Sequence, residues 1–303
     1  MGRGVSLGFC RNNSGPASLV ASVLPDGTIS LVEGSIDIGG SRTAIAQIMA
    51  EVLGLTAQDV IPQVGDTDSI GFTSVTGGSG VAYKSGWAAH EAAIDIKNQI
   101  IKRAAVIWDK DVSEIEYSSG HVRHTSDSEL KMTFKEIASQ INETGEPIIG
   151  KANVNPGGST GSYSALIADV QIDSETGKVD LIKLTAFQDV GYAIHPSYVE
   201  GQIQGGIAQG IGWALNEEYF FDDKGIMRNN SLLDYRMPIS LDLPEIDTVL
   251  VEVPNPNHPY GVKGVGEASI SSPLAAIANA INDAVGVRLR SLPMKPEKLQ
   301  ANL

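Results

Sequence analysis

The first part of the chain alternates between strand-like and helix-like patterns of apolar residues. Residues 5–10 read VSLGFC and residues 17–40 read ASLVASVLPDGTISLVEGSIDIGG, and their runs of Val, Ile and Ser predict strands. Asp26-Gly27 separates two of these runs and predicts a hairpin turn. Over residues 43–53 the apolar positions recur at helical spacing, with Ser41 as the predicted cap and Gly54 as the end. Strands and helices are therefore expected to follow one another.

The same alternation continues to the C-terminus. DVIPQVGDT at residues 59–67 predicts a strand, and the apolar period over 81–106 predicts a long helix. After Pro156-Gly157-Gly158, the pattern predicts a strand pair (163–173 and 179–191), a helix (197–217), a polar hairpin at FDDKG, an extended segment (246–254) and a final helix from Pro273. We expect a mixed α+β fold of two subdomains, residues 1–150 and 151–303.

Charge and cysteine content remove several function classes. The 303 residues carry a net charge of −14, without the basic stripe that binding to nucleic acid needs. No apolar run reaches the roughly 20 residues that cross a bilayer, and the N-terminus lacks a signal-peptide core, so a cytoplasmic protein is expected. Cys10 is the only cysteine and is expected to be a small buried residue of a strand, which excludes an iron–sulfur cluster held by this chain alone.

Glycines gather in four segments near helix starts: residues 37–43, 73–86, 199–212 and 261–273. Glycine lets the backbone approach a ligand closely, and the first turn of a helix offers unpaired N–H donors to an anion. Each segment alone is typical of a tight turn, whereas four together indicate an extended anionic cofactor. GGSGVAYKS lacks the glycine before lysine of a P-loop, and GSGVAY lacks the third glycine of a dinucleotide fingerprint.

With these segments in order, the chain resembles the C-terminal half of the molybdenum-binding subunit of the xanthine dehydrogenase and aldehyde oxidase family. HPYGVKGVGEAS, residues 258–269, resembles the family's loop with the catalytic glutamate. DVGYAIHPSYVEGQIQGGIAQGIGWAL, residues 189–215, is similar to a cofactor-binding signature of that half. The resemblance extends over essentially all 303 residues.

The resemblance assigns the candidate site residues. Glu267 matches the general base, with Gly266 beside it, and Gln202 matches a glutamine near the cofactor. A lone Glu before a helix is usually a cap or a solvated acid, and Gln202 alone is typical of a surface, so the flanking motifs carry both assignments. The small-residue loop expected to wrap the cofactor consists of Gly77, Gly78, Ser79, Gly80 and Val81. No side chain of this chain is expected to ligate a metal.

One segment departs from the family pattern. Gly39-Gly40-Ser41 stands where the family has Gly-Gln-Gly, so Gly39 and Gly40 are expected to contact the cofactor without the amide side chain at the second position. The contact of that amide is therefore lost, or made by backbone or solvent.

The resemblance also implies an activity, cofactors and partners. The reaction would hydroxylate an electrophilic carbon of an N-heterocycle such as nicotinate, or of an aldehyde, with oxygen from water. The cofactor would be molybdenum-molybdopterin, in a dinucleotide form such as the cytosine dinucleotide. Electrons would pass to iron–sulfur and FAD subunits, and a large molybdopterin subunit would supply the other half of the site, as in nicotinate dehydrogenase.

Three alternatives stay open from the sequence. A non-catalytic protein that inserts the molybdenum cofactor would also bind it, but would not need Glu267. A stand-alone phosphate-binding module would bind its ligand without partners. Xanthine or carbon monoxide could replace the N-heterocycle within the same family, and the chain can be a natural half-subunit or a shortened form of a longer one.

Overall fold

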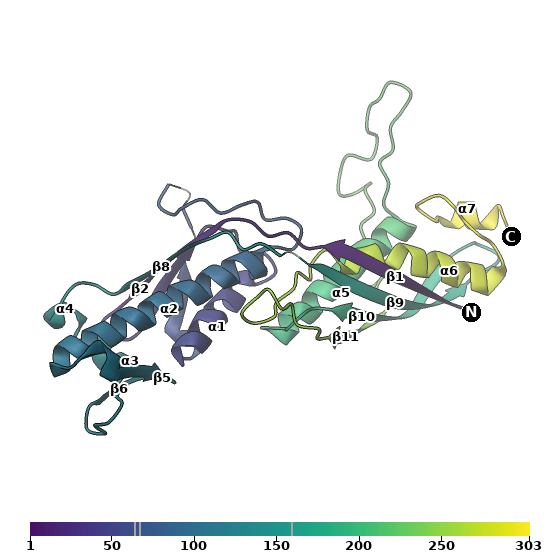
Figure 1. Ribbon diagram of the computed structural model, residues 1–303. Helices are drawn as coiled ribbons and strands as arrows, with labels where there is room; N and C mark the ends of the chain where they lie inside the picture. Colours follow the sequence, from purple (N-terminus) through teal and green to yellow (C-terminus); the bar gives the residue numbers. More distant parts are fainter. Residues whose placement is uncertain (64, 67, 159) are drawn as a thin grey trace. The chain divides into compact units, whose positions relative to one another are not determined.

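The computed structural model describes residues 1–303 except 64, 67 and 159, and the chain forms two compact units (Figure 1). Unit 1 consists of Met1–Asn12, Thr160–Pro254 and Lys263–Leu303. Unit 2 consists of Asn13–Ser159 and Asn255–Val262. The polypeptide therefore passes between the two units four times.

Unit 1 is a four-stranded sheet with helices. The strand order is β1 (Gly2–Arg11), β9 (Gly161–Ile172), β10 (Val179–Asp189), β11 (Glu245–Val251). Neighbours are antiparallel except β10 and β11, which are parallel. The other elements are α5 (Pro196–Leu215), the 3₁₀ turn η3 (Ser269–Ser271), α6 (Pro273–Val285) and the short α7 (Pro296–Gln300).

The core of unit 1 lies between one face of this sheet and helices α5 and α6. Leu166 and Leu184 from the sheet pack with Ile207 of α5 and Ile277 of α6, all at 2% exposure or less. The backbone of β1 approaches α6 so closely that a Cβ at Gly4 would lie 2.0 Å from a carbonyl oxygen of the helix. Glycine at this strand position therefore allows helix and sheet to touch.

Unit 2 holds two sheets and four helices. The larger sheet has the order β4 (Val60–Gln63), β3 (Ile29–Glu33), β2 (Ala17–Val23), β8 (Ile149–Val154). The smaller one is β5 (Ile115–Ser118), β6 (His121–His124), β7 (Lys131–Thr133). The helices are α1 (Ser41–Leu53), α2 (Val81–Trp108), α3 (Phe134–Ser139) and α4 (Ile141–Thr144), with the 3₁₀ turns η1 (Ala57–Asp59) and η2 (Val112–Glu114).

The core of unit 2 packs α1 and α2 against the larger sheet. Helix α1 packs on α2, and the buried residues of this core include Ile45 and Met49 on α1, Ile96 on α2, and Leu19 and Leu31 on the sheet. Apolar residues at spacings of three and four put these helix positions on one face, which the sequence pattern indicated.

The mixed α+β class and the helices α1, α2, α5 and α6 are confirmed, and three details of the prediction are wrong. Ser41 is the first residue of α1 rather than its cap, because the cap position is Gly40. A further short helix, α7, follows the one that begins at Pro273. Of the strand predicted over 59–67, β4 covers Val60–Gln63, and residues 64 and 67 lie outside the described part.

The division of the chain differs from a single boundary near residue 150. Such a boundary would pass through β8, which begins at Ile149 and pairs with β2. It would also separate β1 from its partner, because β1 pairs with β9 along its whole length. Long-range strand pairing therefore makes both units discontinuous in sequence.

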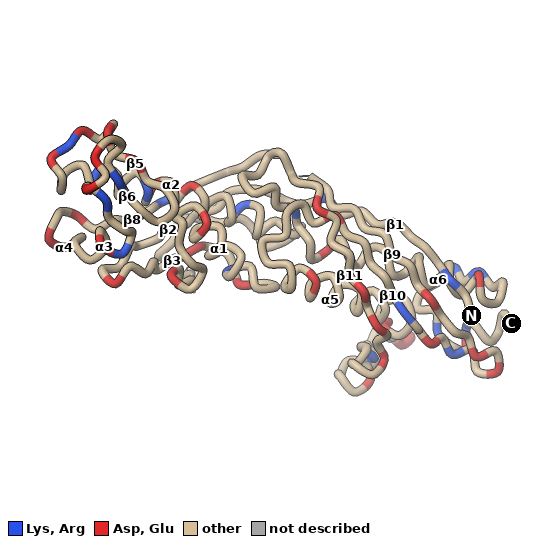
Figure 2. Tube along the Cα trace, turned by 90° about the horizontal axis from the view of Figure 1, so that it is seen from below, with Lys and Arg blue, Asp and Glu red and all other residues tan. Residues whose placement is uncertain are grey.

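Charged residues of both signs are interspersed in each unit, as Figure 2 shows. Several are paired across neighbouring strands, for example Arg3 with Asp169 at 2.6 Å and Arg123 with Glu116 at 2.6 Å. In the described part of the chain, no helix has the length and apolar character needed to cross a membrane.

Candidate functional site

Glu267, the predicted base, lies in unit 1 in the loop that leads into η3 and α6. Its side chain is exposed, whereas the neighbouring residues Gly264, Ala268 and Ser269 are buried. The Glu267 side chain is therefore exposed between buried and partly buried neighbours of the same loop.

Two buried neutral side chains hold the loop on the N-terminal side of Glu267. Asn12, which follows β1, accepts a hydrogen bond from the Gly264 N–H through Oδ1 at 3.0 Å. The Ser162 hydroxyl on β9 donates to the Gly264 carbonyl at 2.5 Å. Both side chains are almost fully buried, at 3% and 0% exposure, so these bonds are shielded from water.

Side chains of β9 and β10 hold the next carbonyls on either side of Glu267. The Gln188 amide on β10 donates to the Val265 carbonyl at 2.8 Å, and the Ser164 hydroxyl on β9 donates to the Ala268 carbonyl at 3.2 Å. The backbone of the loop is therefore held on both sides of Glu267.

Helix α5 carries Gln202, which is half-buried and whose side chain makes no hydrogen bond with another described residue. One turn later, a Cβ at Gly206 would lie 1.9 Å from the Ser269 hydroxyl oxygen, and one at Gly210 would lie 2.6 Å from Pro273 Cγ. These glycines thus let α5 pack directly on the segment that follows Glu267.

The glycines of α5 have two different surroundings. Gly206 and Gly210 face protein, whereas Cβ atoms at Gly201 and Gly205 would meet nothing within 4 Å. Only the second pair leaves space beside the helix. The whole segment was expected to bind the cofactor. In the structure, two of its glycines are packing positions and two are open positions.

Cys10 on β1 lies close enough to Glu267 to be affected by its charge. Partial burial raises the pKa of the Cys10 thiol first, and the negative charge of Glu267 raises it further. The thiol is half-buried rather than fully buried, which corrects the expectation for this residue.

The small-residue loop, residues 77–81, belongs to unit 2 and leads into α2. Gly78 and Ser79 adopt positive φ angles of 59° and 51°, and a Cβ at Gly78 would lie 2.4 Å from Asn13 Cγ. A Cβ at Gly77 would meet no atom closer than 4.0 Å. Gly80 is the cap residue of α2 and Val81 its first residue, and no side chain caps this helix. The loop therefore combines tight backbone packing at Gly78 with open space at Gly77.

Lys84 fixes the segment that precedes this loop. Its side chain is fully buried, and Nζ donates to the Ser74 carbonyl at 2.8 Å, the Ser74 hydroxyl at 2.8 Å and the Val75 carbonyl at 2.7 Å. Burial lowers the pKa of Lys84, and the nearby carboxylate of Glu33 counteracts this shift. The sequence around Lys84 does not indicate this role, because its one recognisable pattern is that of a P-loop without the glycine before lysine.

Gly39 and Gly40 lie at the start of α1 in unit 2. Both adopt the left-handed conformation, with φ angles of 59° and 75°, and no side chain caps the helix. The Asp37 carboxylate accepts from the Arg42 N–H at 3.2 Å and closes this turn. Gly40, which stands where the family has glutamine, therefore has a left-handed backbone conformation that favours glycine.

The motif HPYGVKGVGEAS spans both units, since residues 255–262 belong to unit 2. His258 is 5% exposed, and its Nδ1 accepts the Tyr260 N–H at 3.1 Å. Its ring lies edge-on to Trp87, with centroids 5.7 Å apart, and 5.2 Å from the ring of Tyr83. Burial lowers the pKa of His258 to about 4, so the imidazole is neutral at pH 7. His258 is thus an aromatic anchor of unit 2.

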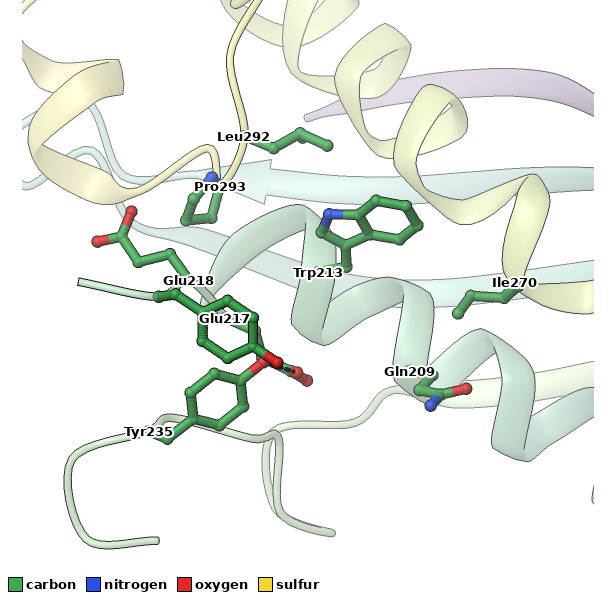
Figure 3. Close-up of a pocket in the computed structure, with 9 residues that line it drawn as sticks. Gln209, Trp213, Glu217, Glu218, Tyr235, Ile270, Leu292 and Pro293 are labelled. Atoms are coloured by element: carbon green, nitrogen blue, oxygen red, sulfur yellow. Dashed lines mark hydrogen bonds between the residues drawn. The ribbon is translucent and has the colours of Figure 1, made fainter. Parts of the chain in front are cut away.

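An open pocket of about 410 Å³ lies in unit 1 beside α5 (Figure 3). Gln209 and Trp213 reach it from the helix, and the Tyr235 hydroxyl donates to Glu217 at 2.8 Å, a bond that raises the pKa of Tyr235 to about 12. Its lining comprises Gln209, Trp213, Glu217, Glu218, Tyr219, Tyr235, Ile270, Leu292 and Pro293. Neither Glu267 nor Gln202 lines this pocket.

The described residues contain no group of three or more His, Cys, Asp or Glu side chains arranged to hold a metal ion. A metal at Glu267 would therefore have to be carried by a bound cofactor. The candidate site in the described residues therefore consists of the glycine-rich loops and the exposed Glu267, without a cluster of metal ligands.

Comparison with known proteins shows the family of the chain. Residues 1–244 match the family model of the molybdopterin cofactor-binding domain. The chain belongs to the molybdenum-binding subunits of the xanthine dehydrogenase and aldehyde oxidase family. A xanthine dehydrogenase molybdenum-binding subunit of Escherichia coli O157:H7 is 33% identical over 281 residues, which are 90% of this chain and 37% of the relative.

Solved structures of the family contain the same fold. A reconstituted CO dehydrogenase from Oligotropha carboxidovorans superposes with a TM-score of 0.89 at 26% identity, over 99% of this chain and 40% of that one. Quinoline 2-oxidoreductase from Pseudomonas putida 86 gives 0.87 at 29%, over 99% of this chain and 41% of that one. The chain thus spans about two fifths of the length of the molybdenum-binding chains that it matches.

Proposed function

We propose that this chain supplies the general base and part of the cofactor cradle to a molybdenum hydroxylase. The observation that carries the proposal is the fixed backbone around Glu267. Buried side chains hold the carbonyls of Val265 and Ala268 while the carboxylate between them is exposed. A family motif in such a loop is the arrangement that a positioned base requires.

The residues present fit a molybdopterin cofactor. The 28-residue helix α2 follows its cap residue Gly80 without a side-chain cap or an acidic residue in the first turn, so its first N–H groups can donate to phosphate or pterin oxygens. At α1 the first N–H groups are already bonded within the turn, Ser41 to Ile38, Arg42 to Asp37 and Thr43 to Gly40. Gly77 in unit 2, and Gly201 and Gly205 in unit 1, each leave open space beside their own backbone.

When bound, the cofactor supplies a two-electron acceptor and the site at which water-derived oxygen is activated. The carboxylate of Glu267 takes up the proton that is released as this oxygen adds to an electrophilic carbon of the substrate. Gln202 is the side-chain amide available to orient the cofactor, because it is not engaged by another described residue.

For the substrate we propose an N-heterocycle of the nicotinate class, with an aldehyde as the second possibility. Among the relatives, nicotine 6-hydroxylase large subunit from Paenarthrobacter nicotinovorans is named for an N-heterocycle, at 30% identity over 90% of this chain. We further propose a dinucleotide form of the cofactor, such as the cytosine dinucleotide, a large molybdopterin subunit that completes the site, and iron–sulfur and FAD subunits that accept the electrons.

The test is Glu267→Gln in the complete enzyme. Loss of a general base slows turnover by about 10²- to 10⁴-fold. Molybdenum content, measured by elemental analysis, should stay at the wild-type level, because the amide keeps the shape of the carboxylate. The matched control is Glu297→Gln on α7, an exposed acid outside the site that should leave both values unchanged.

Two outcomes would contradict the proposal. Full turnover in the Glu267→Gln enzyme would remove the base assignment. A wild-type preparation that holds molybdenum cofactor, releases it to other enzymes and hydroxylates none of the N-heterocycles and aldehydes tested would instead favour a cofactor-insertion protein.

A further inference from the structure

The face of the unit 1 sheet that points away from α5 and α6 is apolar and exposed. Leu7 on β1 is 81% exposed, Tyr163 on β9 63%, and Val249 on β11 40%. The register places Leu7, Ala165, Phe187 and Val249 in one row across all four strands. An antiparallel sheet that faces water normally carries polar residues at these alternate positions.

The contrast with the other face is consistent along each strand. On β1, Val5, Leu7 and Phe9 are exposed, whereas Gly4 and Ser6 at the alternate positions are buried against the helix side. Side chains alternate between the two faces of a strand, so the exposed set belongs to one surface. We call this surface the outer face. Its members are Val5, Leu7, Phe9, Tyr163, Ala165, Ile167, Thr185, Phe187, Val249 and Val251.

Paired charges border the outer face at one end. Arg3 and Asp169, on the neighbouring strands β1 and β9, form an ion pair at 2.6 Å. Lys183 on β10 pairs with Asp247 on β11 at 2.5 Å. An apolar centre with a charged border is the composition of a protein–protein interface rather than of a solvated sheet.

We propose that the outer face binds the rest of the molybdenum-binding subunit, which this sequence does not include. This inference rests on the proposed function, because it assumes a complete subunit. The solved relatives contain 99% of this fold within chains of which it makes up only 40% or 41%. More than half of each such chain must therefore pack elsewhere, and a sheet with one uncovered apolar face offers the missing layer.

A second copy of this chain is the weaker occupant. The chain carries a net charge of −14, so two copies face each other with strong mutual repulsion. The outer face itself has few charges at its centre that could offset this repulsion. Its apolar rows suit a partner layer with apolar side chains of its own.

The first experiment places a photo-cross-linking amino acid at Leu7 in the complete enzyme. Leu7 is exposed in the isolated fold, so the replacement should not disturb folding. We expect the cross-linked peptides, identified by mass spectrometry, to come from the part of the molybdenum-binding subunit outside residues 1–303, whether it lies on the same polypeptide or on another. Cross-links to a second copy of residues 1–303 or to an iron–sulfur or flavin chain, or none at all, would overturn the proposal.

The second experiment compares Leu7→Lys with Val106→Lys. Val106, on α2 of unit 2, is 72% exposed and serves as a matched apolar position away from the outer face. Leu7→Lys should weaken assembly of the enzyme, measured by native mass spectrometry, at least tenfold more than Val106→Lys. Equal effects of the two variants would contradict the proposed surface.

These experiments can distinguish a failure of the proposed surface from a failure of the proposed function. An enzyme that cross-links as expected but holds no molybdenum and performs no hydroxylation would refute the function and retain the surface. An active molybdenum enzyme whose Leu7 position cross-links to a second copy of residues 1–303 or to an iron–sulfur or flavin chain would refute only the surface.

Discussion

The two units fix their glycine-rich segments by different chemistry. In unit 1, the backbone next to Glu267 is held by neutral groups, chiefly Asn12, Ser162 and Gln188, and the start of the same loop is held by an ion pair of Lys263 with Asp189 at 2.6 Å. In unit 2, ionisable side chains do this work, because Lys84 holds residues 74–75 and His258 anchors residues 255–262. A shared set of neutral bonds spreads the stabilisation over several residues, whereas a buried cation concentrates it in one.

The largest expected effect comes from removing that cation. Lys84→Met leaves the oxygens of Ser74 and Val75 without their donor, and the fully buried Glu33 without a nearby positive charge. The free energy of unfolding should fall by about 3 kcal/mol, measured by chemical denaturation. The exposed Lys151→Met in the same unit should change it by less than about 0.5 kcal/mol.

A double variant tests whether charge is the cause. Adding Glu33→Gln to Lys84→Met removes the second charge and should restore part of the loss. If the double variant is instead less stable than Lys84→Met alone by the full cost of a second core substitution, charge is not the cause of the loss in unit 2.

The next effect is a pH dependence that arises from His258. Its pKa is about 4 in the folded chain and 6.5 in a model peptide, so between these values the unfolded chain binds a proton that the folded chain does not. The free energy of unfolding should therefore fall as the pH drops from about 6.5 to about 4, by about 3 kcal/mol in total. Denaturation curves at several pH values measure this slope.

His258→Gln supplies the control for that slope. The variant is less stable at pH 7 because the packing with Tyr83 and Trp87 is lost, but the contribution of this residue to the slope should disappear. An unchanged slope in His258→Gln would mean that another group of the chain titrates in this range.

The smallest effect is expected in the neutral network of unit 1. Asn12→Ala leaves the Gly264 N–H without its acceptor and should lower the free energy of unfolding by about 1 to 2 kcal/mol. Because no group of this network titrates, the loss should be the same at pH 4.5 and pH 7. The exposed Asn230→Ala is the matched control. If the loss of stability in Asn12→Ala differs between the two pH values, the difference between neutral anchors in unit 1 and ionisable anchors in unit 2 is wrong.

The sequence predicts the elements of the fold better than their partners. Apolar periodicity indicated α1, α2, α5 and α6, and Asp26-Gly27 indicated the β2–β3 hairpin, because these signals are local. The pairing of β1 with β9 joins residues as far apart as Gly2 and Val170. No local pattern encodes such a pairing. The predicted boundary near residue 150 therefore separates β1 from β9.

The candidate site shows the same limit. The family motif identified Glu267, and its roles and those of the cofactor loops stay predictions to be tested by the variants above. Asn12 and Ser162, which hold its loop, are single polar residues without a characteristic spacing. Only the fold reveals them, because burial and a partner 100 or more residues away define their role.

The four passages of the chain between the units have a consequence for how the protein can be cut. A break in the connection after residue 158 would give an N-terminal fragment that still owns β1 and a C-terminal fragment that still owns residues 255–262. Each fragment then carries a piece that completes the other's unit. We expect the two fragments of the cleaved protein to elute together in size-exclusion chromatography and to separate only in denaturant.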